Sequence, residues 1–160
     1  MFGAPPEHDL NFDKNAVAST SAFLTRVQKL ATKLTSETNG AQSKTFDELL
    51  SALEAANKTG SLKDDQKSLL IDALNLLIDY ETKIGKSRFF HVAFARLMEL
   101  TNKVQQASAI LEQGSNDCER FAFGCLLLGL YPYAPHLASE LWSDTGLTSV
   151  SSSQLQSASD

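Results

Sequence analysis

The sequence predicts an all-α protein, a bundle of about five to six helices. Apolar residues recur at intervals of three and four along most of the 160 residues. Capping residues, glycines and prolines divide the chain into segments of helical length. No stretch alternates between apolar and polar residues for long enough to predict a strand, and no repeat of about 20 to 50 residues is found. With 42% hydrophobic residues, the chain is long enough to form one domain.

The first half of the chain predicts three helices. Residues 1–14, which include two consecutive prolines, are expected to be an extended lead-in segment. Apolar residues then follow the i, i+3, i+4, i+7 pattern over about 15–36, at Phe23, Leu24, Val27, Leu30, Ala31 and Leu34. A capping box of Thr45 and Glu48 predicts a second helix that ends near Gly60. Ser61 with Asp64 predicts the start of a third, which runs to Gly85.

Three more helices follow. The clearest period runs from Arg88 to about Gln113, with apolar steps of four and three. A fifth helix, capped by Asn116 with Glu119, is apolar almost all round over 121–130, so we expect it at the centre of the bundle. Pro135 starts a sixth helix. The bundle is thus predicted to occupy 15–146, and the Ser-, Thr- and Gln-rich residues 147–160 are expected to be a disordered tail.

Composition excludes several classes of function. A net charge of −5 argues against a protein that binds nucleic acid over its whole surface. Cys118 and Cys125 cannot pair within one helix, and we expect both to be buried. The three histidines lie in separate elements, and no phosphate-binding loop is found, so we expect no metal, no cofactor and no catalytic residue in this segment. Gly124 and Gly129 are expected to allow close helix packing.

No signal peptide is recognised, and the longest apolar run, 121–134, is too short to span a bilayer. We therefore expect a soluble protein with no membrane partner.

Two sets of basic residues are candidates for phosphate contacts. Arg26, Lys29 and Lys33 share one face of the first predicted helix, and Arg96 and Lys103 share a face of the fourth. The alternative is that both sets are the solvated faces that any amphipathic helix carries.

Three segments resemble leucyl-tRNA synthetases of the bacterial or mitochondrial type. Residues 2–12, followed by the segment 22–27, resemble the family's Ala-Pro-Pro-Glu-x-Asp-Leu-x-Trp and Phe-Leu-x-Arg-Val. The segment 88–102 resembles its Phe-Asn-Thr-Ala-Ile-Ala-x-Leu-Met-Glu-Leu-x-Asn helix. Residues 131–142 are similar to Ala-Pro-Phe-Ala-Pro-His-Ile-Ala-Glu-Glu-Leu-Trp, which valyl and isoleucyl enzymes share in a looser form. These motifs bracket residues 2–142 in family order, although 35–67 match poorly.

The resemblance implies the helical bundle called the anticodon-binding domain of class I synthetases. It implies a domain that binds the body of leucine tRNA and positions it for aminoacylation by a separate catalytic domain, in the bacterial cytoplasm or the mitochondrial matrix. ATP and Mg would belong to the parent enzyme. His91, Phe12 and Gln28 depart from the usual Asn, Trp and Trp. Because neither His-Ile-Gly-His nor Lys-Met-Ser-Lys-Ser occurs, we expect an excised or truncated part of the ligase that cannot activate leucine alone. The alternative is a helical protein-interaction module that keeps the scaffold without RNA binding.

Overall fold

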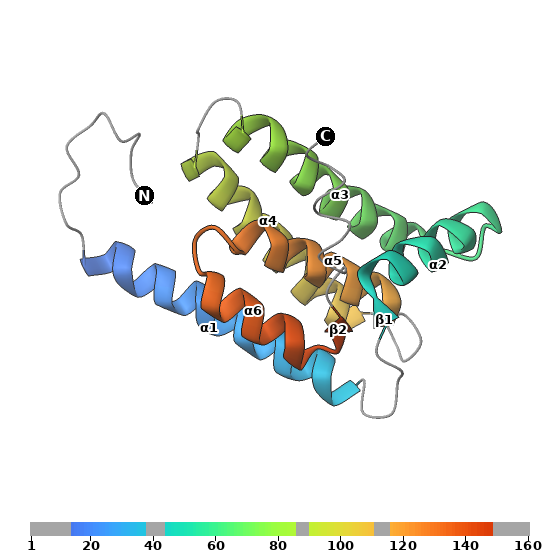
Figure 1. The fold of residues 1–160 in the computed structure, drawn as a ribbon, viewed down its shortest axis with the longest axis horizontal. Helices are drawn as coiled ribbons and strands as arrows, with labels where there is room; N and C mark the ends of the chain where they lie inside the picture. Colours follow the sequence, from blue (N-terminus) through green and yellow to red (C-terminus); the bar gives the residue numbers. More distant parts are fainter. Residues whose placement is uncertain (1–13, 38–43, 86–89, 111–115, 149–160) are drawn as a thin grey trace.

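A computed structural model describes residues 14–37, 44–85, 90–110 and 116–148, which form an all-α bundle as predicted (Figure 1). The predicted lead-in segment up to residue 13 and the predicted tail from residue 149 lie outside the described residues. The described helices are α1 (Lys14–Glu37), α2 (Phe46–Lys58), α3 (Asp64–Gly85), α4 (Phe90–Ile110), α5 (Asn116–Leu130) and α6 (Pro135–Asp144). Two short strands, β1 (Lys44–Thr45) and β2 (Leu147–Thr148), pair in parallel.

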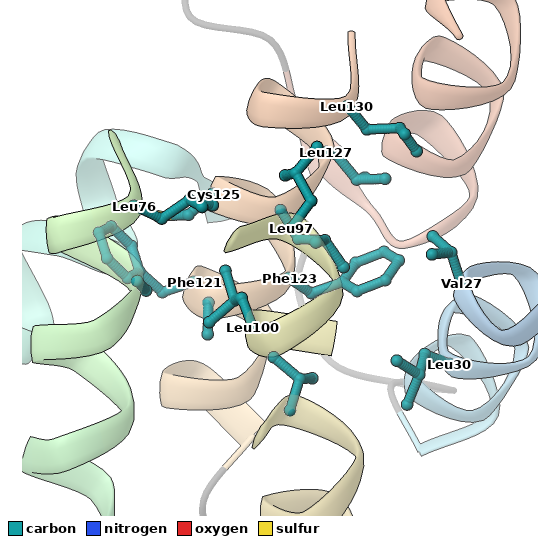
Figure 2. Packing of buried hydrophobic residues seen from close by; sticks show 14 of the residues in the cluster. Val27, Leu30, Leu76, Leu97, Leu100, Phe121, Phe123, Cys125, Leu127 and Leu130 are labelled. Carbon is teal, nitrogen blue, oxygen red and sulfur yellow. The ribbon is translucent and has the colours of Figure 1, made fainter. Parts of the chain in front are cut away.

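Helix α5 lies at the centre of the bundle, as its all-round apolar sequence predicts. It contacts each of the other five described helices. From Cys118 to Leu130 all its residues except Leu128 are buried. Figure 2 shows its side chains between Val27 of α1 on one side and Leu76 of α3 on the other. The burial of this apolar helix by its neighbours is the main stabilising contribution that the fold offers.

Two glycines let neighbouring helices approach α5 closely, which confirms the role expected for them. A Cβ atom at Gly129 would lie 2.6 Å from Leu97 Cδ2 of α4. One at Gly124 would lie 2.8 Å from Phe46 Cε2 of α2. Both distances are well below the ~3.5 to 4.0 Å at which carbon atoms pack. Any larger residue at either position would therefore force the facing side chain, or the helix that carries it, to shift.

The start of α2 is capped as predicted, whereas the start of α3 is not. The Thr45 hydroxyl accepts a hydrogen bond from the Glu48 amide at 3.2 Å, and the Thr45 amide donates to Glu48 Oε2 at 2.8 Å. The prediction that Ser61 and Asp64 cap the start of α3 is wrong. The Ser61 hydroxyl donates instead to the Ala56 carbonyl, at the end of α2. The Lys63 amide donates instead to Gln66 Oε1, at 2.8 Å.

Residues 147 and 148, which the sequence assigns to the tail, are part of the fold. Leu147 is only 3% exposed and aligns with Lys44 in the two-stranded ladder. The buried Arg120 of α5 lies beside this segment, and its Nη2 is 3.4 Å from the carbonyl oxygens of Thr145 and Gly146. Leu147, an isolated aliphatic residue in a polar stretch, is therefore part of the core. Local composition does not predict its burial.

Candidate nucleic-acid interface

The charged side chains are distributed unevenly among the helices, although the whole chain is acidic. Between residues 18 and 36, α1 carries three basic residues and no acidic one. Helix α2 carries three acidic residues and one lysine, and α3 carries four aspartates and one lysine between 64 and 79. Helix α4 contacts both α1 and α3 (Figure 1). Positive charge is therefore concentrated on α1, and negative charge on α2 and α3.

Arg26 is the basic residue that links α1 to α4. Its Nη1 donates to Asn102 Oδ1 at 3.1 Å, although the two residues are 76 positions apart in the sequence. Arg26 is half-buried, next to the fully buried Val27. A guanidinium group has five N–H donors, so the bond to Asn102 fixes its position and leaves donors for a further acceptor. Both residues lie in motifs that carry the family resemblance.

Lys29 and Lys33 continue the basic face of α1. Both are exposed, and they follow Arg26 at i+3 and i+7, which places the three residues along one side of the helix. The buried positions of α1 alternate with them, as Val27, Leu30, Ala31 and Leu34 turn toward the core. The amphipathic packing of α1 thus fixes the direction in which its cations point.

Arg96 and Lys103 occupy a different environment, between α4 and α3. The Lys103 ammonium group bonds Asp72 Oδ2, and the Arg96 guanidinium lies 2.7 Å from Glu99 Oε2 and 3.5 Å from Asp79 Oδ2. The hydrogen bond to Glu99, and then the charge of that carboxylate, raise the pKa of Arg96. These groups line a groove of about 270 Å³. Because the carboxylates already neutralise both cations, a phosphate approaching them would also meet negative charge.

The five basic residues predicted as one class of contact therefore separate into two groups. Arg26, Lys29 and Lys33 form a basic surface on α1, which we call the α1 face. Arg96 and Lys103 belong to an ion-pair network with α3. Sequence reasoning missed that network, although a signal was available. Asp72 and Asp79 are seven residues apart, as are Arg96 and Lys103, and helical spacing of this kind favours two pairs between antiparallel neighbours.

The described residues offer little for other chemistry. None of them forms a group of three His, Cys, Asp or Glu side chains that could hold a metal ion. Cys118 and Cys125 are buried and form no disulfide, and burial raises the pKa of Cys125 to about 12. A thiol with so high a pKa is protonated at neutral pH and is a poor nucleophile. No helix in the described ranges is long and apolar enough to cross a membrane.

The chain is similar in sequence to leucine–tRNA ligases of several bacteria. A leucine–tRNA ligase of Edwardsiella ictaluri is 31% identical over 146 residues, which are 91% of this chain and 15% of the relative. A leucine–tRNA ligase of Desulforapulum autotrophicum is 32% identical over 149 residues, or 91% of this chain and 16% of the relative. One of Shewanella baltica is 30% identical over 146 residues, with the same 91% and 15% coverage. The chain thus spans about 15% of the length of these curated relatives. No protein-family model matches it.

Proposed function

Because more than nine-tenths of this chain corresponds to one segment of leucine–tRNA ligases, we propose that it is the tRNA-binding helical bundle of such an enzyme. In this role it holds leucine tRNA for aminoacylation at a catalytic domain outside this sequence. ATP and Mg act in that catalytic domain. The bacterial cytoplasm and the mitochondrial matrix are the compartments in which this ligase type works.

The observation that carries the proposal is the α1 face. An acidic chain can bind a polyanion only where its cations are clustered and its acids are elsewhere. Between residues 18 and 36, α1 carries three cations and no acidic residue of its own. Lys29 and Lys33 are exposed on it, and Arg26 is held by Asn102. Because phosphates repeat regularly along an RNA strand, a row of cations along one helix can contact several of them.

The mechanism is electrostatic positioning rather than base recognition. Lysines on α1 neutralise phosphates, and the restrained guanidinium of Arg26 donates to phosphate oxygens with little loss of side-chain entropy. Structured RNA is recognised largely through its shape and its backbone, which suits a surface of this kind. Arg96 and Lys103 contribute less, because a phosphate has to replace their carboxylate partners.

The test is a titration of the chain with leucine tRNA at several salt concentrations, with one residue replaced by glutamine at a time. Arg26→Gln, Lys29→Gln and Lys33→Gln should each weaken binding and lower the slope of log K against log salt by about 0.7 to 0.9. Arg96→Gln and Lys103→Gln should have smaller effects. The matched control is Lys58→Gln, which removes an exposed lysine from the acidic helix α2 and should bind like the parent.

If all the α1 variants bind like the parent at every salt concentration, the α1 face is only a solvated helix surface. The alternative function, a helical protein-interaction module derived from the synthetase scaffold, would then replace this proposal. The same titration with the catalytic domain restored to the chain measures the affinity in the larger protein.

A further inference from the structure

An unusual apolar surface lies on α3, away from the α1 face. Among the described residues, three of the five exposed large hydrophobic side chains belong to this helix: Ile71 (58% exposed), Leu74 (41%) and Ile78 (58%). They follow one another at i, i+3 and i+7 and therefore form a single stripe, which we call the α3 ridge. Scattered exposed aliphatic residues are common, but an ordered stripe of them indicates a surface that another element covers.

Two grooves of different character flank the α3 ridge. On one side, between α2 and α3, lies a groove of about 200 Å³ lined mainly by apolar side chains, including Leu50, Leu53, Leu62 and Leu70. Ile71 and Leu74 form part of its wall. On the other side, between α3 and α4, is the groove of about 270 Å³ that contains Ile78 and the carboxylates of Asp72, Asp79 and Glu99. The ridge thus divides an apolar channel from a charged one.

The charge of this surface decides what kind of molecule can cover it. The two grooves contain four carboxylates, of Glu54, Asp72, Asp79 and Glu99, against three cations, of Lys67, Arg96 and Lys103. Asp64 and Asp65 add two exposed carboxylates at the start of the same helix. This excess of negative charge opposes the approach of RNA, and it favours a partner that presents lysine or arginine beside its apolar residues.

We propose that the α3 ridge and its two grooves bind an amphipathic helix of another protein, one with aliphatic residues on one face and basic residues beside them. The aliphatic side chains would enter the apolar groove between α2 and α3, as anchors do when a helix lies in a hydrophobic groove. The basic side chains would meet the carboxylates on the side of α4. The partner and the tRNA then occupy different faces of the bundle.

A second copy of the chain fits this surface less well. In a two-fold dimer each copy presents the same patch to the other. Each copy would bring the three carboxylates of Asp72, Asp79 and Glu99 against only two cations, so the two patches would repel through their like net charge. A basic helix avoids this repulsion and still covers the α3 ridge.

The experiment uses the full chain and three labelled synthetic peptides of about 18 residues, followed by fluorescence anisotropy. The first peptide has leucines on one helical face and lysines elsewhere. The second has the same leucines with glutamate in place of lysine. The third has the composition of the first with its leucines scattered around the helix. The lysine peptide should bind at least tenfold more tightly than either of the others.

The double variant Ile71→Gln/Ile78→Gln should weaken binding of the lysine peptide at least tenfold. Both residues are exposed, so the variant should keep the circular dichroism spectrum and the thermal midpoint of the parent. The matched control is Leu128→Gln on α5, which removes an exposed large hydrophobic side chain outside the α3 ridge and should leave peptide binding unchanged. Three outcomes would each overturn the proposal. The first is that the three peptides bind the parent chain equally, and the second is that Ile71→Gln/Ile78→Gln binds the lysine peptide as tightly as the parent does. The third outcome is that the parent self-associates in sedimentation equilibrium and Ile71→Gln/Ile78→Gln does not.

Discussion

Replacement of Gly129 by alanine should destabilise the bundle, although alanine is the better helix former. The new Cβ would lie 2.6 Å from Leu97 Cδ2 and 3.5 Å from Leu76 Cδ2. The first distance is about 1 Å shorter than a normal carbon–carbon contact of ~3.5 to 4.0 Å. Leu97 is fully buried, so its side chain has no solvent space into which it can turn. One methyl group at residue 129 therefore has to displace α4 or force Leu97 out of its rotamer.

Two opposing effects set the size of the change. Overpacking of this kind costs about 1 to 3 kcal/mol. The gain from replacing glycine by alanine inside a helix is about 0.5 to 1 kcal/mol. At the middle of these two ranges the cost exceeds the gain, so Gly129→Ala should lower the free energy of unfolding by about 1 kcal/mol. Leu97→Ala alone should lower it by ~2 to 5 kcal/mol, because it leaves a cavity in the core.

The double variant Gly129→Ala/Leu97→Ala shows whether the steric clash with Leu97 causes the loss of stability. The alanine methyl at residue 129 would then enter space that Leu97 has vacated, since the two groups meet in the parent structure. The double variant should therefore be more stable than the sum of the single changes predicts, by about 1 to 3 kcal/mol. Gly129→Ala should combine additively with Leu53→Ala, a buried substitution on α2.

The assay is urea unfolding followed by circular dichroism, with the slope m compared among variants so that the midpoints report stability. A Gly129→Ala protein as stable as the parent, or an additive double variant with Leu97→Ala, would refute the close contact between α4 and α5.

Three further predictions concern the capping box, a buried thiol and catalysis. Thr45→Ala should lower the free energy of unfolding by about 1 kcal/mol in urea titrations, because it removes the cap of α2. The control, Thr32→Ala at an exposed position, should change it by less than about 0.5 kcal/mol. If the two substitutions change the free energy of unfolding equally, Thr45 does not act as a cap. Burial raises the pKa of Cys125 from 9.0 to about 12, so the thiol of the unfolded chain loses its proton at a lower pH than the thiol of the folded chain. The free energy of unfolding should therefore fall as the pH rises from 9.0 to about 12, by up to about 4 kcal/mol. Cys125→Ala should have a flatter profile, and identical profiles would exclude this cause. The chain alone should show no leucine-dependent exchange of pyrophosphate into ATP, and exchange by a clean preparation would contradict its assignment as a non-catalytic segment.

The helices of this fold can be predicted from the sequence because the residues that favour helix formation locally also place apolar side chains on the face that packs in the core. Leu97, Leu100 and Val104 recur at helical spacing and are all buried. Thr45 and Glu48 have the residue types and the separation of a capping box, and they form one. Both patterns are complete within a single helix and its cap, and both predictions are confirmed.

The predictions that differ from the structure depend on contacts outside the predicted element. Ser61 has the residue type of a helix cap, but its hydroxyl bonds the end of the preceding helix because the turn brings the Ala56 carbonyl within reach. Leu147 stands in a polar stretch, yet it is buried beside β1, whose residues are about a hundred positions away. Neither the hydrophobic period nor local composition contains information about such contacts.

The division of the basic residues follows from the register of two neighbouring helices. Asp72 pairs with Lys103, and Asp79 pairs with Arg96. As the chain advances by seven residues along α3, the partner moves back by seven along α4, which is the relation expected of antiparallel helices. This register turns Arg96 and Lys103 toward acidic partners, whereas Asn102, beside Lys103 in sequence, reaches Arg26 on α1. A basic residue on a helix therefore favours RNA binding only when the neighbouring helix does not already supply its counter-charge. Of the two basic sets, the α1 face is the one whose arginine is held by an uncharged amide, that of Asn102, rather than by a carboxylate of a neighbouring helix, and for that reason it carries the proposed function.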